Sequence, residues 1–339
     1  MLSRASNKSL LILAMCSIVL LFCAIQSSEA AGDQIVLRFA GNLPADHFVT
    51  RNQELYAKLV ESKTKGRVKI EIYPAGQLFS DKDLVKALPM GAVDMAEATC
   101  AQWTGIEPLW LMLDLPLFYK DRKHWHRVLD SEVGKMLQSE FEKKTNVKFL
   151  YFLDYGATGQ ASKTPLRTLE DYKGKRIRGT GEVVLKALQA MGAAPVFLGG
   201  GEVYLALQRG TIDAANSGMS SFWERKYYEV TKFISGTDFT LGNFFVGINK
   251  TKWQSLPADI QKAMLEAAEE AKISSRIECE KSDNEAMRKL REKGVEIYDP
   301  PPKEKERWRQ ATKPVAHSFF ISRGGDKAKL ILQMVEKID

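Results

Sequence analysis

The sequence predicts an α/β protein made of two similar lobes with a ligand cleft between them. Three observations support this prediction. Expected strands alternate with expected helices, a ten-residue pattern occurs in both halves of the chain, and a segment of 36 residues (258–293) contains neither Gly nor Pro. Alternating strands and helices indicate a mostly parallel sheet covered by helices. The repeated pattern indicates two related lobes, and the uninterrupted segment indicates one helix that spans both.

The first elements follow from apolar periodicity. Residues 35–40 (IVLRFA) and 67–73 (RVKIEIY) are rich in apolar and β-branched side chains and are predicted strands. Ser80 followed by Asp83 predicts a helix start, because a Ser side chain can cap the free N–H groups there. An amphipathic helix between the two strands is predicted from apolar residues at helical spacing, namely Leu55, Tyr56, Leu59 and Val60.

The alternation continues toward the middle of the chain. Gly91 ends the helix that starts near Ser80, and a short strand is predicted over 92–96. One helix is predicted from Val128 to Phe141, and a strand over 147–153 follows it. These elements extend the expected α/β sheet.

An internal repeat predicts where the ligand site lies. Residues 87–96 (ALPMGAVDMA) align with residues 206–215 (ALQRGTIDAA) at an offset of 119 positions. Each copy is predicted as a helix end, a Gly stop and a short strand with an Asp; coincidence is the alternative, since such units are common. In open parallel sheets ligands bind beyond the carboxyl ends of strands. This rule points to residues 98–103 and 216–223, and so to a cleft between lobes.

The segment from 258 to 293 is predicted to be one long helix. Pro257 precedes it and Gly294 follows it, as start and stop signals should. At ~1.5 Å per residue it would be about 54 Å long, longer than one small lobe is wide. Coiled-coil pairing is the rival interpretation, but no strict heptad of large apolar residues persists. A helix that spans both lobes is therefore expected.

The N-terminus predicts export. Arg4 and Lys8 precede an apolar run over 10–25, and Ser28-Glu29-Ala30 fits a signal-peptide cleavage pattern, so residues 1–30 are a predicted signal peptide cleaved near Ala30. A retained anchor is the alternative, but 16 apolar residues fall short of the roughly 20 that span a bilayer. The mature chain should be an exported protein with two cysteines, Cys100 and Cys279, which either form one bridge or remain separate buried thiols.

Composition and motifs argue against several function classes. The net charge is +7, but the charges are scattered, which disfavours nucleic-acid binding. His124 and His126 form the one close His pair and lack further zinc ligands. No G-x-S-x-G elbow occurs, and Gly199-Gly200-Gly201 is not a Walker A motif. We therefore predict neither metal nor cofactor, and no enzyme activity.

The mature chain resembles the periplasmic solute-binding proteins of TRAP (tripartite ATP-independent periplasmic) transporters over residues 35–310. No single matching segment is specific to this family, but the order and spacing of the segments together are. The matching segments are 66–78 (GRVKIEIYPAGQL), 91–95 (GAVDM), 115–118 (LPLF), 172–178 (YKGKRIR), 191–195 (MGAAP), 202–210 (EVYLALQRG) and 228–230 (YEV).

The resemblance implies a periplasmic binding protein fold of two α/β lobes with a ligand cleft between them, crossing hinge strands and a long helix that spans both lobes. We expect lobe I to contain residues 31–155 plus about 244–285, and lobe II residues 156–243 plus about 286–339. Such receptors trap a small organic acid by closing the lobes and deliver it to membrane permease subunits driven by an ion gradient. Family members are mostly monomeric, which implies a monomer here.

The resemblance also implies an anchor for the ligand carboxylate. In the segment KRIR the matching residue is Arg178, and a guanidinium presents a planar fork that fits two carboxylate oxygens. Arg176 lies two residues earlier, on the same face of a regular strand, and is the competing candidate. Asn42 matches a polar contact after the first strand, and His47 follows on the same loop.

Other positions depart from sialic-acid-type members of the family. Ser217, preceded by Asn216, stands where those members have Asn. Thr158 replaces a second Arg, and Gly200 replaces an aromatic residue. Thr99 and Gln102 replace an acidic and basic pair. The polar sugar-binding set is thus missing, which disfavours a sugar acid as ligand.

Aromatic residues suggest what replaces those polar groups. Trp103 and Trp223 lie just beyond the two copies of the repeat, and Phe244 and Phe245 lie on a predicted hinge strand. Ligand pockets favour aromatic walls, so a hydrophobic or aromatic monocarboxylate, or a keto acid, is the expected solute. Two alternatives remain open: a ligand-binding protein for a sensor or another permease class, and an exported enzyme on the same scaffold.

Overall fold

The structure is a computed structural model that describes residues 34–339. The predicted signal peptide therefore lies outside the described residues. Within that range no helix is long and apolar enough to cross a membrane. Both cysteines of this part, Cys100 and Cys279, are buried and free, which decides between the two alternatives in favour of separate thiols.

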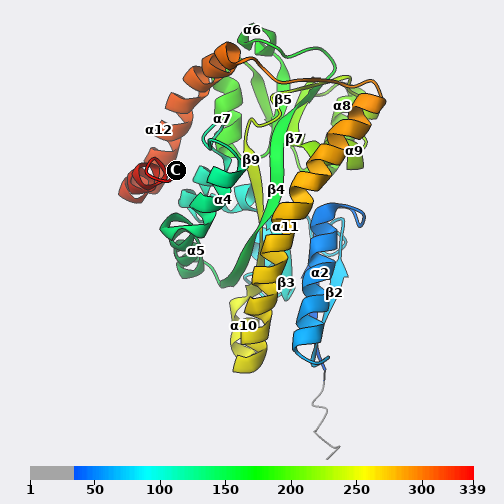
Figure 1. Cartoon of the computed structure of the whole chain (residues 1–339), viewed down its shortest axis with the longest axis vertical. Helices are drawn as coiled ribbons and strands as arrows, with labels where there is room; N and C mark the ends of the chain where they lie inside the picture. Colours follow the sequence, from blue (N-terminus) through cyan, green and yellow to red (C-terminus); the bar gives the residue numbers. More distant parts are fainter. Residues whose placement is uncertain (1–33) are drawn as a thin grey trace, which may run out of the picture.

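One mixed sheet runs through the molecule (Figure 1). Its strand order is β2-β1-β3-β9-β4-β7-β5-β6, and β8 and β10 pair alongside. The strands are β1 (Ile35–Ala40), β2 (Val68–Tyr73), β3 (Met95–Thr99), β4 (Val147–Ser162), β5 (Arg176–Gly179), β6 (Ala194–Phe197), β7 (Ala214–Gly218), β8 (Phe233–Ser235), β9 (Leu241–Asn249) and β10 (Glu296–Tyr298).

Two groups of parallel strands are joined by two long antiparallel strands. We call β1, β2 and β3 the first strand group and β5, β6 and β7 the second; pairing is parallel within each. The strands β4 and β9 run between the groups and pair antiparallel with each other and with their neighbours. The sheet is thus mixed rather than mostly parallel, because two of the crossings between the groups are the antiparallel strands β4 and β9.

Helices cover both faces of the sheet. They are α2 (Phe48–Lys63), α3 (Asp81–Ala87), α4 (Arg122–Asp130), α5 (Glu132–Lys144), α6 (Leu169–Tyr172), α7 (Glu182–Ala190), α8 (Val203–Arg209), α9 (Met219–Glu224), α10 (Lys250–Ser255), α11 (Ala258–Glu292) and α12 (Pro302–Val335). Short 3-10 helices are η1 (Cys100–Trp103), η2 (Pro108–Asp114), η3 (Gly200–Glu202) and η4 (Tyr227–Glu229).

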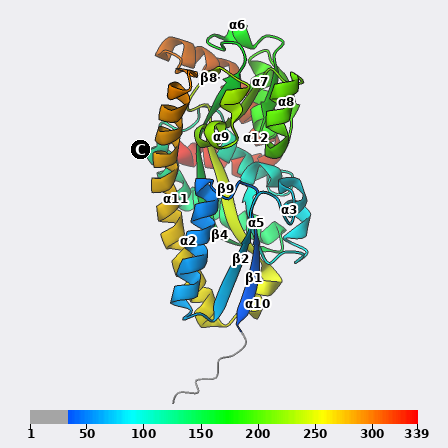
Figure 2. The same cartoon turned by 90° about the vertical axis from the view of Figure 1, so that its right-hand side faces the viewer.

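The long helix α11 confirms the helix predicted over 258–293. It has 35 residues and contacts α2, β4 and α9, so it runs along both strand groups (Figures 1 and 2). Its buried positions recur at helical spacing, and its outer face is mostly charged, with Leu265, Ile273 and Ile277 also exposed. The helix α12 packs against α7 and η2 and is interrupted at Gly325, whose φ of 61° is not helical.

Three predicted boundaries were wrong. The strand β3 begins at Met95 rather than at residue 92, because the chain turns through Gly91, whose φ is 74°. The helix predicted from Val128 to Phe141 is two helices, since Ser131 ends α4 and its side chain caps α5 by accepting from the N–H of Val133. The strand β4 continues to Ser162, through a small, polar segment without apolar alternation.

The internal repeat is structural. Adding the offset of 119 to the bounds of β3 (95–99) gives those of β7 (214–218). The repeated aspartates make equivalent contacts: Asp94 accepts from the N–H of Arg38 at 2.8 Å, and Asp213 accepts from the N–H of Arg176 at 2.8 Å. Each arginine also donates to a carbonyl of the preceding turn at 2.8 Å. In both strand groups, therefore, the same set of Arg–Asp and Arg–carbonyl hydrogen bonds joins neighbouring strands.

Gly156 marks an irregularity where β4 crosses between the groups. The register of β4 and β9 shifts between Asp154 and Gly156, whose φ is 99°. A Cβ there would lie 2.5 Å from the carboxylate of Asp283 and 2.6 Å from the sulfur of Cys279. The backbone of α11 thus approaches β4 as closely as it does only because residue 156 has no side chain.

Replacing Gly156 with alanine should lower the free energy of unfolding by more than about 2 kcal/mol, because left-handed strain and a steric clash add. Gly174→Ala is the matched control: its φ is 70°, but nothing lies within 4 Å of the added Cβ. That control should lose only about 1 kcal/mol of strain energy. Urea unfolding of both variants measures the difference; equal losses would contradict the clash.

Candidate ligand-binding cleft

A cavity of about 480 Å³ lies where the two strand groups face each other. Its wall includes residues that follow the carboxyl ends of β1, β3, β5 and β7, together with residues of the crossing strands β4 and β9. This position agrees with the expectation from strand order. The lining residues used below are Asn42, Asp81, Thr99, Gln102, Asp114, Tyr155, Thr158, Arg178, Gly200, Ser217, Arg225, Thr240 and Phe244.

Arg178 lies in β5 and lines the cavity. Its side chain is held from behind: Nε donates to the carbonyl of Leu198 at 3.0 Å, and one terminal nitrogen donates to the carbonyl of Asn216 at 2.7 Å. The residue is 7% exposed, and among residues 34–339 no carboxylate pairs with it. Burial lowers its pKa. Two of its five N–H donors are used, so the arrangement offers the others to an anion.

The competing candidate, Arg176, lies outside the cavity lining. Its exposed guanidinium pairs with Asp213 at 2.7 Å and donates to the carbonyl of Gly210. These contacts of Arg176 therefore hold β5 against the turn before β7. Two arginines of one strand, two positions apart, thus have different surroundings.

A second cation, Arg225, was missed by the sequence reasoning. It follows α9, lines the cavity and lies close enough to Arg178 to lower the pKa of that residue further. A Cβ added at Gly200 would lie 3.2 Å from its guanidinium. The missing aromatic residue at Gly200 was the available signal, because the absent side chain leaves space that Arg225 occupies. Nothing in the local sequence around Arg225 marks it.

Hydroxyl groups form the cavity wall on β4, on β7 and at Thr240, just before β9. The hydroxyls of Thr158 and Thr240 lie 2.8 Å apart, and those of Tyr155 and Ser217 lie 3.0 Å apart. Asn216 is fully buried and outside the lining; its side chain donates to the hydroxyl of Thr158 at 3.2 Å. Thr158 and Ser217 are thus wall residues, whereas Asn216 supports the wall and Arg178.

Acidic and amide groups form the wall near the first strand group. Asp81 accepts from the N–H of Thr99 at 3.2 Å and lies 3.5 Å from the side-chain nitrogen of Asn42. Gln102 follows on η1. Burial raises the pKa of Asp81, and it raises the pKa of the underlying Glu97 to about 8. This wall therefore holds protons more tightly than exposed carboxylates do.

The structure corrects the expectation that Trp103 and Phe245 form cavity walls. Both are 0% exposed and pack edge to face, with ring centroids 5.3 Å apart, and Phe141 lies against both. Both side chains point into the core, because the complete burial of a large ring gains the most free energy. Phe244, the neighbour of Phe245 on β9, lines the cavity instead.

Trp223 and His47 also lie outside the lining. Trp223 stacks on Tyr228 at 4.9 Å, beside the ammonium group of Lys289. His47 is buried; its Nδ1 accepts from the N–H of Val49, and its Nε2 lies 2.9 Å from the carboxylate of Glu224. Burial lowers its pKa. His47 therefore contacts the segment behind the cavity rather than the cavity itself.

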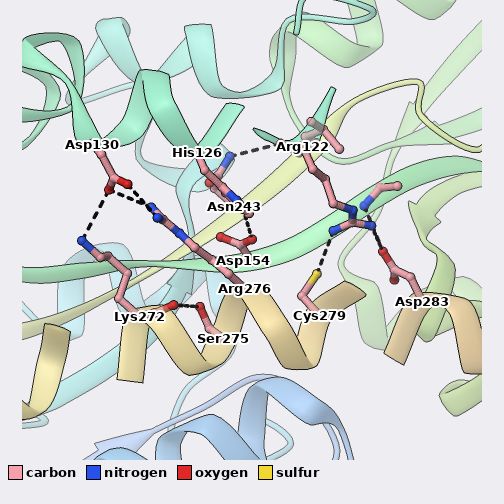
Figure 3. Close-up of polar contacts among 12 residues, drawn as sticks. Arg122, His126, Asp130, Asp154, Asn243, Lys272, Ser275, Arg276, Cys279 and Asp283 are labelled. Atoms are coloured by element: carbon pink, nitrogen blue, oxygen red, sulfur yellow. Dashed lines mark hydrogen bonds and ion pairs between the residues drawn. The ribbon is translucent and has the colours of Figure 1, made fainter. Parts of the chain in front are cut away.

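A polar network lies between α4, β4 and α11, behind the crossing strands (Figure 3). At one end Arg122 pairs with the buried Asp283 and donates to the sulfur of Cys279 at 3.2 Å. Asp283 also accepts from the N–H groups of Ala157 and Ser220, and burial raises its pKa to about 6. The figure shows these contacts along one side of α11, which they tie to the crossing strand.

The two histidines of the close pair, His124 and His126, both interact with neighbouring groups of the protein. His126 lies 2.6 Å from Asp154 in this network, and His124 accepts from the N–H of Lys120. Within residues 34–339 no group of three or more His, Cys, Asp or Glu side chains is placed to hold a metal ion.

Comparisons with known proteins agree with this geometry. The family model for bacterial extracellular solute-binding proteins, family 7, matches residues 39–323. The chain is 32% identical to the C4-dicarboxylate-binding periplasmic protein DctP of Rhodobacter capsulatus, over 88% of this chain and 90% of that protein. It is 30% identical to the 2,3-diketo-L-gulonate-binding periplasmic protein YiaO of Escherichia coli, over 73% and 77%.

Solved structures show the same fold. A TRAP periplasmic solute-binding protein from Sulfurospirillum deleyianum with bound succinate has a TM-score of 0.84 and 26% identity, over 91% of this chain and 100% of that one. Another, from Desulfovibrio salexigens with bound orotic acid, has a TM-score of 0.86 and 23% identity, over 90% and 98%. These neighbours are two-lobed α/β proteins, which confirms the predicted fold class.

Proposed function

The chain belongs to family 7 of the bacterial extracellular solute-binding proteins, the periplasmic receptors of TRAP transporters for small organic acids, and from this we propose how it holds its ligand. One carboxylate of the solute pairs with Arg178, assisted by the positive charge of Arg225. The loaded protein then delivers the solute to the permease subunits. Members of this family are receptors rather than enzymes.

The observation that carries the proposal is the state of Arg178. Its guanidinium is 7% exposed, two backbone carbonyls orient it, and no carboxylate of the described chain neutralises it. Burying an unpaired charge costs free energy. A ligand carboxylate would remove that cost and would complete a bidentate, charge-assisted pair.

Closure of two lobes would exclude water from this pair. We propose the boundaries given by the sequence: 31–155 plus about 244–285 for one lobe, and 156–243 plus about 286–339 for the other. The crossing strands β4 and β9 then form the hinge. Hinges of this kind absorb the change in backbone angles while each lobe moves as a body.

The many polar side chains among the lining residues favour a polar organic acid. A hydrophobic or aromatic monocarboxylate was expected from Trp103, Trp223, Phe244 and Phe245, and of these four residues Phe244 alone lines the cavity. Tyr155 and Phe244 are the aromatic residues among its lining. We therefore propose a small acid with further polar groups, such as the keto acid of the original expectation or a hydroxy acid. Succinate and 2,3-diketo-L-gulonate, named for the relatives, are acids of this polar kind.

A thermal-shift screen tests this function. The mature protein would be unfolded, stripped of ligand and refolded, then heated with hydroxy, keto, aliphatic and aromatic carboxylates and with neutral sugars. A ligand at about 100 times its dissociation constant stabilises the folded protein by ~2.7 kcal/mol. Shifts are expected with carboxylates; shifts only with neutral solutes would contradict the proposal.

Substitution of Arg225 by glutamine should weaken carboxylate binding by about tenfold, because one nearby positive charge is lost while Arg178 remains. Lys226→Gln is the matched control, since Lys226 is exposed and lies outside the lining. Calorimetric titration of both variants at equal ionic strength measures the effect. An affinity in Arg225→Gln equal to that of the control would remove Arg225 from the site.

A further inference from the structure

One carboxylate in the cavity wall has no protein partner. Asp114 is the last residue of η2, lines the cavity and is 8% exposed. Among residues 34–339 no hydrogen bond or ion pair reaches its oxygens. Burial alone raises its pKa, to about 7, and neither Arg178 nor Arg225 contributes to that change. Neither arginine forms an ion pair with it.

Asp114 differs in this respect from the other buried acids of the described chain. Glu107, at the opposite end of η2, pairs with Lys144 at 2.9 Å. The remaining buried acids also have a cation, a His or an N–H donor as partner, and they are Glu97, Glu140, Asp154 and Asp283. Because buried charges are normally paired, the missing partner of Asp114 points to a group that enters the cavity.

We propose that Asp114 determines ligand specificity by accepting a hydrogen bond from a hydroxyl or ammonium group of the solute. The inference rests on the proposed function, because the carboxylate of the same solute is placed at Arg178. An ionised carboxylate is an acceptor only, so a donor satisfies it. A keto oxygen or a methylene group at that position leaves it unpaired, and the cavity selects hydroxy or amino carboxylates over their keto and unsubstituted analogues.

The proposal has a defined pH dependence. Two titratable groups interact with Asp114, Cys100 on η1 and Tyr119 in the loop after η2, and burial raises the pKa of both, so they stay neutral near pH 7. The ionised form of Asp114 is the stronger acceptor and the form that cannot donate, and the pKa of Asp114 in the free protein is about 7. Affinity for a hydroxy acid should therefore fall about tenfold from about pH 8 to about pH 6, and binding near pH 7 should release a proton.

Calorimetric titration with three matched sets of acids tests the proposal. In each set the carbon skeleton is constant and one substituent changes. The sets are propionate, lactate, alanine and pyruvate; succinate, malate, aspartate and oxaloacetate; and butyrate, 4-hydroxybutyrate and 4-aminobutyrate. Within the set that fits the cavity, the hydroxy or amino member should bind at least about tenfold more tightly than the others. Comparing the hydroxy-substituted with the amino-substituted acid of a set shows whether Asp114 accepts from a hydroxyl or from an ammonium group.

The variant Asp114→Asn should reduce this discrimination to within about threefold, because an amide both donates and accepts. It should also flatten the pH dependence, although Asp81 and Glu97 still titrate. Glu107→Gln removes a buried carboxylate from the other end of η2, outside the lining, and should leave both properties unchanged.

Three outcomes would overturn the inference. Equal affinity for the donor-bearing and unsubstituted acids, or unchanged discrimination in Asp114→Asn, would remove Asp114 from recognition while carboxylate capture at Arg178 stands. Tightest binding of a keto acid, with proton uptake, would mean that Asp114 is protonated and donates instead. Failure of every acid to bind the wild-type protein would overturn the proposed function and this inference together.

Discussion

The Arg178→Ala protein is expected to bind its acid about 3–5 kcal/mol more weakly than the wild type, a loss of more than a hundredfold. The guanidinium is the one buried cation of the cavity whose orientation is fixed by two backbone carbonyls. Without it the ligand carboxylate would enter a desolvated site with no bidentate partner. Isothermal titration with the tightest acid from the screen measures the loss.

Folding of Arg178→Ala should be intact, because the substitution removes a buried charge that no carboxylate neutralises. Its melting temperature without ligand should equal or exceed that of the wild type. Arg176→Ala is the matched control on the same strand: it breaks an exposed pair with Asp213 and should leave affinity unchanged. If Arg176→Ala abolished binding and Arg178→Ala did not, the two assignments would have to be exchanged.

The Arg122→Ala protein is expected to lose about 3 kcal/mol of unfolding free energy at neutral pH. Arg122 is the cation that pairs with Asp283, whose side chain is 2% exposed. After the substitution the N–H groups of Ala157 and Ser220 would remain as its donors. Urea unfolding at about pH 7 and about pH 5 measures the loss, which should shrink at the lower pH because Asp283 can then bind a proton.

Two further variants isolate the cause. The double variant Arg122→Ala/Asp283→Asn should recover much of the stability, since neither charge is then buried alone. Arg276→Ala breaks a more exposed pair with Asp130 in the same network (Figure 3) and should cost no more than about 1 kcal/mol. No recovery in the double variant would mean that packing of the Arg122 side chain, rather than its charge, stabilises the folded protein.

Asp283 also gives the wild-type protein a pH dependence of defined sign. Its folded-state pKa of about 6 is above the usual value near 4 for an unfolded Asp. The folded state therefore holds this proton more tightly, and its contribution to stability falls as the pH rises from about 4 to about 6. The variant Asp283→Asn should lack this component.

Much of the fold could be predicted because the relevant signals are local. Ser80 caps α3 by accepting from the N–H of Asp83, and Pro257 and Gly294 flank α11, as expected from residue types alone. The repeat at an offset of 119 predicted two equivalent strands, and β3 and β7 agree with it residue by residue. The second half of β4 escaped prediction because small and polar residues in a buried crossing strand have no apolar alternation.

The site could be predicted in part. Asn42, Gln102, Thr158, Arg178 and Ser217 line one cavity, as expected from strand ends and from the family resemblance. Arg225 and Asp114 were not found in this way. Nothing in the local sequence marks Arg225, and the matching segment 115–118 that follows Asp114 carries no sign that Asp114 lines a cavity. The roles proposed for them depend on what is absent nearby in residues 34–339: a side chain at Gly200, and a partner for the Asp114 carboxylate.

The sequence by itself determined the α/β class, the internal repeat and the helix α11, and it singled out Arg178, which lines the cavity, as the proposed carboxylate anchor. Capping, turn chemistry and apolar periodicity depend on residues a few positions apart, so a single chain carries them. The tertiary structure decided which side chains reach the cavity: Trp103 and Phe245 lie in the core, His47 lies behind the wall, and Arg225 lies in front of Gly200. Those positions depend on packing between segments that are far apart in the sequence. That packing determines both which large rings are buried and how much space surrounds each charged group.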